Sequence, residues 1–304
     1  MLEINKIHNY NCLDGLKLLD DCSVDCCVTS PPYWGLRDYG VAGQLGLEPK
    51  FETYIEKLSE IFNEVYRVLK DEGTCFVNIG DTYGGSGKGV GGKNSKELFH
   101  FPTLHKVESD IENKCLCQIP SRFSLSMTDN YWVLRNEIIW HKPNSMPTSA
   151  SDRFTVDFEK IFFFVKQQKY YFEQQLDKSI WAESDSRFLN GASRTGKKTS
   201  QGNYAIDKGG AYREDGMRNM RTVWTINTES FSGAHFATYP QLLVERMIKA
   251  GCPKDGIVLD PFMGAGTTAV VARKLDRNFI GFELNKKYIQ IAEKRLYEEL
   301  GMFL

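Results

Sequence analysis

The chain has 304 residues, of which 41% are hydrophobic and 25% charged, a globular composition with enough length for one large or two modest domains. The formal net charge of −1 means that any affinity for nucleic acid must come from a local basic surface. The sequence lacks an apolar run of the ~20 residues that span a bilayer, and its first residues lack a secretory apolar core, so we expect a cytoplasmic protein without a membrane segment.

The placement of the eight cysteines favours free thiols over disulfides or zinc ligands. Cys26, Cys27 and Cys75 lie in apolar runs that predict buried strands. Cys115 and Cys117 form a close pair, but the sequence offers no second pair at metal-ligand spacing. We therefore predict reduced, mostly buried thiols and no metal site.

The first quarter of the chain predicts a strand, a helix and a second strand. Residues 24–28 form a continuous apolar run, which is typical of a strand covered on both faces. Apolar residues then recur at helical spacing from Pro49 to about residue 69, residues 71–73 should stop the helix, and residues 74–79 predict the next strand. Short turns join the three elements, so we expect a right-handed parallel crossover.

The turn after the first of these strands, Thr29-Ser30-Pro31-Pro32-Tyr33, combines a hydroxyl, rigid carbonyls and a flat ring. Two prolines end the strand, and the carboxyl end of a parallel strand is where ligands bind in open α/β sheets. These groups suit a planar, polar substrate such as a nucleobase. The alternative is an ordinary proline turn flanked by core aromatic residues.

The middle of the chain contains two glycine-rich segments. Residues 83–92 could cradle phosphates, but no Gly-Lys-Ser/Thr follows them, so we predict a surface loop. A helix at 120–127 and strands at 131–140 and 159–165 come next, and residues 169–172 should pair with the last strand as a hairpin.

The second glycine-rich segment, residues 184–221, mixes basic residues with aromatic ones. This mixture is typical of a nucleic-acid contact surface, and the alternative is a solvated loop. The candidate DNA-binding residues are Arg187, Arg194, Lys197, Lys198, Arg213, Arg218 and Arg221.

The last quarter of the chain predicts a second βαβ unit after an amphipathic helix at 239–250. A strand ending at Asp260 leads into a loop containing Gly264 and Gly266, where the backbone can approach a ligand closely. A helix begins at Thr267-Thr268, so its amides and two hydroxyls can attract a carboxylate or phosphate. The next strand, at 278–282, ends in Glu283, which can accept both ribose hydroxyls, and a terminal helix follows at 285–300.

Asp260-Pro-Phe-Met-Gly-Ala-Gly-Thr-Thr268 resembles the S-adenosylmethionine-binding motif of amino-directed DNA methyltransferases, and Thr29-Ser-Pro-Pro-Tyr33 resembles their catalytic motif. The catalytic motif comes first and the basic insert lies between the two, which is the order of the beta-type members. The resemblance extends over nearly the whole chain and includes residues 44–48, 77–83, 139–144 and 235–240.

This resemblance implies an α/β, Rossmann-like methyltransferase fold with a seven-stranded, mixed, mostly parallel sheet, helices on both faces and a small inserted target-recognition region. Residues 1–180 would form the catalytic half, residues 181–222 the insert, and residues 223–304 the cofactor-binding half. The cofactor would be S-adenosyl-L-methionine. Its binding residues would be Asn11, Cys12, Thr238, Asp260, Phe262, Gly264, Gly266, Thr267, Thr268 and Glu283.

The implied reaction transfers a methyl group to an exocyclic amine of a base flipped out of duplex DNA. Ser30 and the Pro31 carbonyl would accept the two N–H bonds of the amine, and Tyr33 would stack on the base. Ser30 favours N4 of cytosine over N6 of adenine, which stays an alternative by the same mechanism. An RNA methyltransferase and a non-catalytic DNA-binding subunit are further alternatives. The implied partners are double-stranded DNA, a second copy of the chain and a cognate restriction endonuclease.

Overall fold

The structure, a computed structural model, describes residues 2–36, 38–85, 111–178, 217–229 and 238–301. The chain divides into two compact units. The first unit consists of residues 1–172 and 222–304, and the second consists of residues 173–221.

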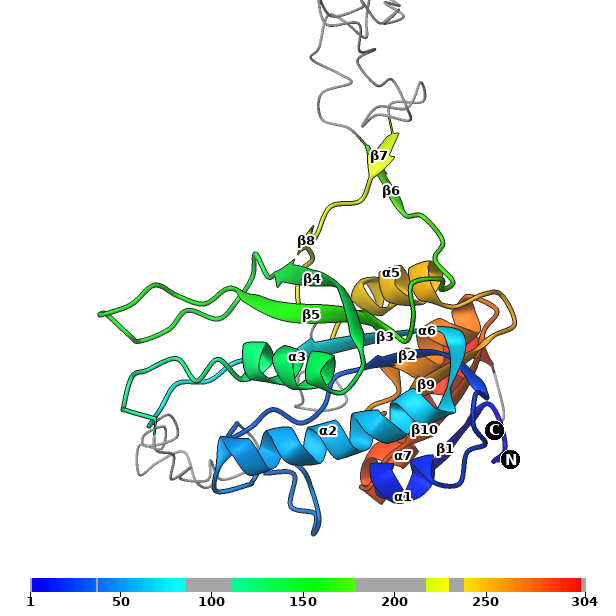
Figure 1. Ribbon diagram of the computed structural model, residues 1–304, viewed down its shortest axis with the longest axis horizontal. Helices are drawn as coiled ribbons and strands as arrows, with labels where there is room; N and C mark the ends of the chain where they lie inside the picture. The colour runs from blue at the N-terminus through cyan, green and yellow to red at the C-terminus, as the bar shows by residue number, and fades with distance from the viewer. Residues whose placement is uncertain (1, 37, 86–110, 179–216, 230–237, 302–304) are drawn as a thin grey trace, which may run out of the picture. The chain divides into compact units, whose positions relative to one another are not determined.

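The first unit is built on one mixed sheet of eight strands in the order β1-β10-β9-β2-β3-β5-β4-β8 (Figure 1). Neighbouring strands are parallel except where β5 meets β3 and β4. The strands are β1 Lys6–His8, β2 Val24–Thr29, β3 Leu69–Ile79, β4 Val133–His141, β5 Phe158–Val165, β8 Val223–Thr225, β9 Ile257–Asp260 and β10 Asn278–Phe282.

The predicted α/β architecture with a mostly parallel sheet is confirmed, as are both βαβ units. The expected number of seven strands is exceeded by one among the described residues. The strands at the two edges of the sheet, β1 and β8, are short segments of three residues each.

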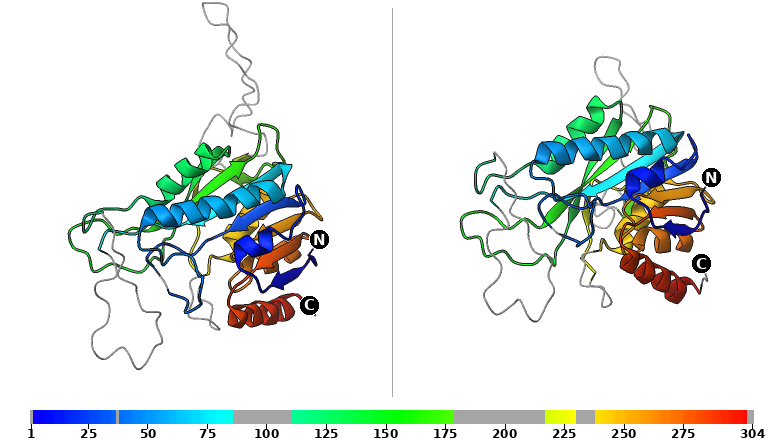
Figure 2. Two further views of the ribbon diagram at one scale, coloured as in Figure 1. Left: turned by 60° about the horizontal axis from the view of Figure 1, so that its bottom comes forward. Right: turned by 90° about the horizontal axis from the view of Figure 1, so that it is seen from below.

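Helices cover both faces of the sheet (Figures 1 and 2). The helices α1 (Cys12–Leu16), α2 (Phe51–Val68) and α3 (Ile119–Asp129) lie on one face. The helices α5 (Gln241–Gly251), α6 (Thr267–Lys274) and α7 (Lys286–Leu300) lie on the other. None of the helices in the described part of the chain is long and apolar enough to cross a membrane.

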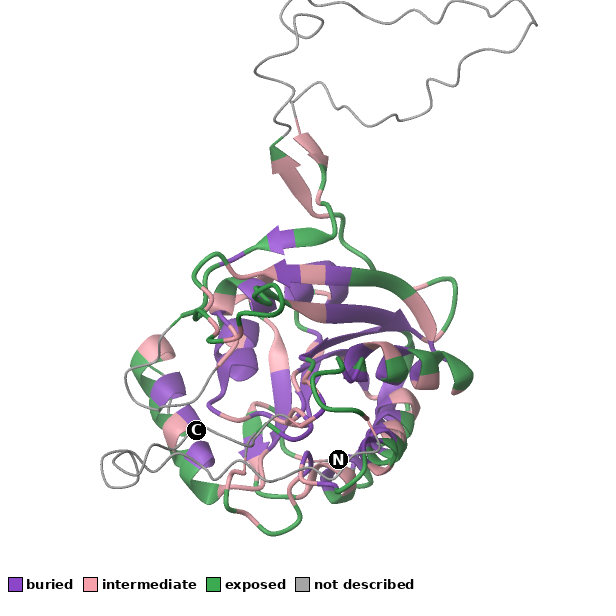
Figure 3. Ribbon diagram, turned by 90° about the vertical axis from the view of Figure 1, so that its left-hand side faces the viewer, coloured by how far each residue is buried: buried purple, intermediate pink, exposed green. Residues whose placement is uncertain are grey.

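Alternate side chains of the central strands pack into two separate core layers, because successive side chains of a strand point to opposite faces of the sheet. Thr74 and Phe76 pack against Gly251 of α5, while Cys75 lies in the core cluster formed with α2. The stripe that predicted α2 is the face that is buried there. Figure 3 shows this pattern as buried strands between helices whose outer faces are exposed.

Two boundaries differ from the prediction. Helix α2 begins at Phe51, after Pro49, and ends at Val68, so that β3 starts at once with Leu69. Residues 71–73, expected to be a turn, belong to β3, where the register with β2 jumps from Val24↔Leu69 to Cys26↔Thr74. The residues predicted to form a turn therefore form a bulge within β3.

The predicted hairpin strand at 169–172 is wrong. Both edges of β5 are already occupied, by β3 and by β4, so no ladder position is left for it. The segment instead packs its Tyr170 and Phe172 rings around Phe163, and the Tyr171 amide donates to the Glu72 carbonyl at 2.8 Å.

All eight cysteines are free thiols, and five of them are buried. Burial raises the pKa of Cys12 and of Cys252 to about 12, which leaves both thiols protonated at neutral pH. Cys22 and Cys115 are exposed.

The described part of the second unit is a short antiparallel ladder. Strand β6 (Leu176–Lys178) pairs with β7 (Met217–Asn219), with Leu176 opposite Asn219. The Met220 amide donates to the Gln175 carbonyl at 2.9 Å, which extends the ladder by one hydrogen bond.

Candidate active site

The two half-sites predicted from the sequence, which are the Thr29–Tyr33 turn and the glycine loop with Glu283, line one cavity of about 1070 Å³. The cavity lies in the first unit, where the carboxyl ends of β2, β3, β9 and β10 meet, as expected for an open α/β sheet. Of the predicted site residues, those on its wall are Asn11, Cys12, Ser30, Pro31, Pro32, Tyr33, Thr238, Phe262, Gly264, Thr267 and Glu283.

Asp260 lies behind this wall and is fully buried. One carboxylate oxygen accepts from the Thr29 hydroxyl at 2.6 Å and the Phe262 amide at 3.0 Å. The other accepts from the Thr268 hydroxyl at 2.6 Å and the Tyr239 hydroxyl at 3.0 Å. Burial raises the pKa of Asp260, and these hydrogen bonds oppose the rise. The carboxylate therefore joins β2, the glycine loop, α6 and the segment before α5.

Gly264 and Gly266 both have positive φ, +53° and +80°. A Cβ on Gly264 would make only an ordinary van der Waals contact, 3.9 Å from the Phe262 carbonyl oxygen, and the Gly264 amide donates to Glu283 at 2.9 Å. A Cβ on Gly266 would lie 2.7 Å from that of Ala292, so this glycine lets α7 pack closely against the loop. The structure thus places Gly264 at the cavity and Gly266, like Thr268, behind it.

Glu283 presents its carboxylate to the cavity from the end of β10. Each oxygen accepts one backbone N–H, from Gly264 at 2.9 Å and from Asn285 at 2.7 Å. Burial raises the pKa of Glu283, while the backbone amides of Asn285, Gly264 and Leu284 act in the opposite direction. Because a carboxylate has about four acceptor sites, Glu283 keeps capacity to accept a ligand hydroxyl.

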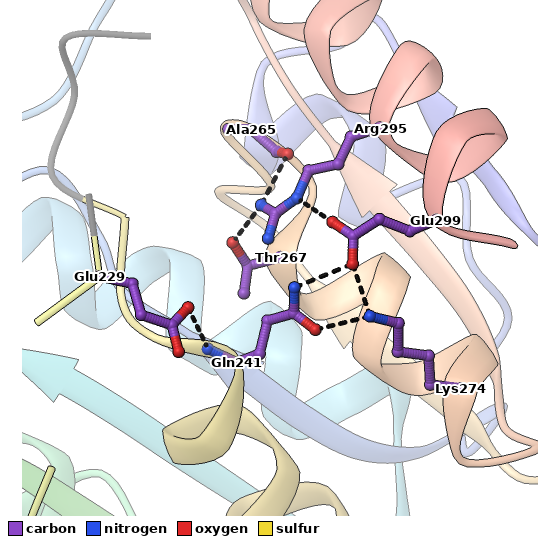
Figure 4. A network of polar contacts seen from close by, with 7 residues as sticks. All are labelled: Glu229, Gln241, Ala265, Thr267, Lys274, Arg295 and Glu299. Carbon is purple, nitrogen blue, oxygen red and sulfur yellow. Dashed lines mark hydrogen bonds and ion pairs between the residues drawn. The ribbon is translucent and has the colours of Figure 1, made fainter. Parts of the chain in front are cut away.

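An ion network centred on the buried Arg295 supports the loop that contains Gly264 and Gly266 (Figure 4). The Arg295 guanidinium donates to the Thr267 hydroxyl at 2.8 Å and to the Ala265 carbonyl at 3.4 Å. It also pairs with Glu299 at 2.7 Å, which in turn accepts from Lys274 and Gln241. Because Thr267 accepts from Arg295, its own proton is free to be donated into the cavity.

We expect Glu299→Gln to lower the free energy of unfolding by about 1–2 kcal/mol at pH 7, because a partly buried charged acceptor is lost. Burial raises the pKa of Glu299, but hydrogen bonds from Lys274, Arg295 and Gln241 outweigh it and hold the pKa at about 2. A depressed carboxyl pKa stabilises the fold above the unfolded-state value and loses that contribution as the pH falls toward the folded-state value. The difference between wild type and variant in urea unfolding should therefore narrow below about pH 4.5. A difference that stays constant down to pH 3 would contradict this role.

The Thr29–Tyr33 turn, which resembles the catalytic motif of the family and is called the catalytic turn below, is held by hydrogen bonds to the sheet and to α2. The Tyr54 hydroxyl donates to the Pro32 carbonyl at 2.9 Å. The Tyr33 ring packs against Gly80, where a Cβ would come within 2.5 Å of it. The Tyr33 hydroxyl lies 2.7 Å from a Glu159 oxygen and 3.3 Å from Ser30 Oγ. Burial, and next the nearby Glu159 carboxylate, raise the pKa of Tyr33 well above its usual value, so the phenol keeps its proton.

Sequence reasoning missed the contribution of β4 and β5 to the site. Glu159, Lys142 and Trp140 line the cavity, as does Asn78 at the end of β3. Because β5 runs against its neighbours, its first residues lie at the edge of the sheet where the parallel strands end. An acid at the start of an intensely apolar strand was the available signal.

The predicted DNA-binding residues Arg187, Arg194, Lys197, Lys198 and Arg213 lie outside the described residues. Arg218 lies in β7, and Arg221 is the exposed last residue of the second unit. Residues 86–92 and 235–237 of the quoted motifs also lie outside the described part. Within that part, no group of three or more His, Cys, Asp or Glu residues could hold a metal ion.

Comparison with known proteins identifies relatives over almost the whole chain. A family model for N6 and N4 methyltransferases, described as DNA methylase, matches residues 24–294. The type II methyltransferase M.Cfr9I of Citrobacter freundii is 38% identical over 301 residues, covering 98% of this chain and 90% of that protein. The type II methyltransferase M.SmaI of Serratia marcescens is 39% identical over 279 residues, covering 91% of this chain and 86% of that protein.

Two solved structures share the fold at low sequence identity. A Thermus thermophilus protein described as a putative DNA modification methylase, in complex with S-adenosyl-L-methionine, superposes with a TM-score of 0.59 at 20% identity. The match covers 98% of this chain and 95% of that one. The PvuII DNA methyltransferase, described as cytosine-N4-specific, superposes with a TM-score of 0.62 at 18% identity and covers 94% of this chain and 86% of its own.

Proposed function

The chain belongs to the DNA methylase family whose model it matches, and from this premise we propose that it methylates the exocyclic N4 amine of cytosine in duplex DNA. It is a type II DNA methyltransferase that uses S-adenosyl-L-methionine. The observation that carries the proposal is that one cavity wall includes both Ser30 and the hydrogen-bonded residues Gly264 and Glu283.

The cofactor-side residues fit a molecule with a carboxylate, a ribose and a flat base. Glu283 has acceptor capacity for ribose hydroxyls. The amino end of α6, with the Thr267 proton directed away from Arg295, suits a carboxylate, and Thr238 lies on the same wall. Asn11 and Cys12 would border the adenine. S-adenosylmethionine, when bound, supplies a methyl group activated by its sulfonium charge.

Ser30 and the Pro31 carbonyl would act on the target amine. An aromatic amine is a poor nucleophile because its lone pair is delocalised into the ring. Two acceptors on its N–H bonds favour a pyramidal nitrogen whose lone pair faces the methyl group, and no covalent enzyme intermediate is needed. The base must leave the duplex stack to reach the cavity, where Tyr33 would stack on it.

The serine at position 30 of the Thr29–Tyr33 motif supports cytosine, as the resemblance to the family implies. The second candidate is N6 of adenine, since the same acceptors would serve that amine. DNA incubated with the protein and cofactor should yield N4-methylcytosine in nucleoside mass spectrometry, with a reaction lacking the cofactor as the control. A dominant N6-methyladenine signal would overturn the choice of base while leaving the amino-methyltransferase assignment intact.

The remaining parts of the proposal concern recognition and partners. We assign target recognition to residues 181–222, with Arg218 and Arg221 among the groups that contact phosphates. A homodimer and a cognate restriction endonuclease are the proposed protein partners. Transfer to RNA in preference to DNA would instead support an RNA methyltransferase. Failure to bind the cofactor in calorimetry would support a non-catalytic DNA-binding subunit.

A further inference from the structure

A chain of four polar side chains runs from the edge of the sheet to the catalytic turn. The Lys142 ammonium pairs with one oxygen of Glu159 and lies 4.3 Å above the Trp140 ring. The other Glu159 oxygen lies 2.7 Å from the Tyr33 hydroxyl, which lies 3.3 Å from Ser30 Oγ. The side chains of Lys142 and Glu159 are 17% and 18% exposed, so the pair is shielded from solvent.

Counting protons along this chain sets the direction of each hydrogen bond. A phenol has one proton to donate, and the charged Glu159 oxygen at 2.7 Å is a better acceptor than the Asn78 amide oxygen at 3.2 Å. Because Tyr33 donates its hydrogen bond to Glu159, the Tyr33 oxygen accepts the hydrogen bond that Ser30 donates. Both lone pairs of Ser30 are then left for a substrate.

We propose that Glu159, held by Lys142, is a positioning residue that fixes the direction of the Ser30 hydroxyl through Tyr33. Ser30 thereby meets the target amine only as an acceptor. An undirected hydroxyl could turn its proton toward the amine and compete for the lone pair that must attack the methyl group. This inference rests on the proposed function, because it concerns the amine-activating step of that reaction.

The position of Glu159 in the sheet fits this role. Its backbone pairs with Trp140 in the β4–β5 ladder. Its neighbour Lys160 pairs with Ile79 in the β3–β5 ladder, and the Lys160 carbonyl accepts from the Asn78 side-chain amide at 3.2 Å. The carboxylate is thus carried by a strand interior in the sheet, while Ser30 sits on a turn that prolines stiffen. Strand-borne groups hold their geometry better than loop-borne ones.

Glu159→Gln reverses the polarity of the chain without changing its shape. Lys142 can only donate, so the amide oxygen should turn toward it and the amide nitrogen toward Tyr33. The Tyr33 hydroxyl must then turn its own proton away from the amide, into the direction from which it accepts the Ser30 hydrogen bond in the wild type. The Ser30 proton is released toward the cavity, and Ser30 is no longer held as an acceptor.

The test measures single-turnover methyl transfer at saturating cofactor and DNA, together with the dissociation constants of both. Glu159→Gln should lower the transfer rate about 10- to 50-fold with unchanged dissociation constants. Tyr33→Phe removes the phenol and frees Ser30 to rotate, so its rate should fall only about 2- to 5-fold. The double variant should return to the rate of Tyr33→Phe, because without the phenol the amide introduced at position 159 has no hydroxyl to reorient. If Glu159 had a merely structural role, the transfer rate of the double variant would fall by the product of the two single-variant factors.

Glu137→Gln is the matched control, because Glu137 pairs with Lys160 at 2.8 Å on the neighbouring strand and lies outside the cavity wall. Its transfer rate should equal that of the wild type. The inference is overturned if Glu159→Gln keeps the wild-type rate, or if the double variant is slower than Tyr33→Phe by the full Glu159→Gln factor. A wild-type protein that binds the cofactor but methylates no DNA would overturn the proposed function and, with it, this inference.

Discussion

Ser30→Ala lowers the single-turnover rate of methyl transfer by about 10²–10³-fold, the size of effect expected for one preorganised polar contact that acts in the transition state. The Ser30 oxygen lies on the cavity wall at the end of β2, with its proton directed to Tyr33. Alanine removes one of the two acceptors proposed to pyramidalise the amine, while the proposed cofactor contact at Glu283 is untouched. The affinity for S-adenosylmethionine, measured by calorimetry, should therefore stay at the wild-type value.

The matched control for this prediction is Ser23→Ala, at the opposite end of the same strand. The Ser23 hydroxyl donates to the Asp20 carbonyl at 2.7 Å, remote from the cavity wall. Its removal should leave the transfer rate unchanged. A Ser30→Ala enzyme within threefold of the wild-type rate would show that Ser30 is not the acceptor.

Asp260→Ala lowers the free energy of unfolding by about 3–5 kcal/mol, which is typical when a fully buried charged hydrogen-bonding group is deleted. The substitution leaves three hydroxyls, of Thr29, Tyr239 and Thr268, and the Phe262 amide without their shared acceptor. Urea denaturation at pH 7 measures the loss. Asp260→Asn keeps the shape but turns one acceptor into a donor, so its loss should be intermediate.

Asp129→Ala, an exposed aspartate at the end of α3, serves as the control and should change the unfolding free energy by less than about 0.5 kcal/mol. Under conditions in which the Asp260→Ala variant is folded, it should also bind the cofactor more weakly. Asp260 holds Tyr239 and Phe262, and these residues position the neighbouring cavity residues Thr238 and Gly264. A loss of less than about 1 kcal/mol in Asp260→Ala would mean that water replaces the carboxylate as the common acceptor.

Local patterns in the sequence predicted the elements that local physics determines. The 3.6-residue stripe of α2 and the continuous apolar strands β2 and β3 are confirmed because each encodes its own buried surface. The glycine loop with Glu283 was predictable for a similar reason, since a βαβ unit brings its two strand ends together within about 30 residues.

Long-range pairing limited the rest. Neither the reversed direction of β5 nor its two occupied edges can be deduced from its own composition, so residues 169–172 were misassigned and Glu159 was overlooked. Asp260 belongs to the predicted motif, but its four partners come from positions 29, 239, 262 and 268. Its part in joining the half-sites emerges only when these segments meet in space.

The β6–β7 ladder has a consequence for how such an enzyme can change over evolutionary time. Strands β6 and β7 pair over three residues each, so Lys178 and Met217 are held opposite one another. For a flexible connection between two paired strand ends, doubling its length costs only about 0.6 kcal/mol of closure entropy. Recombination between relatives could therefore exchange this stretch as a cassette, longer or shorter, at junctions near residues 175 and 220, while the sheet that carries the chemistry is inherited unchanged.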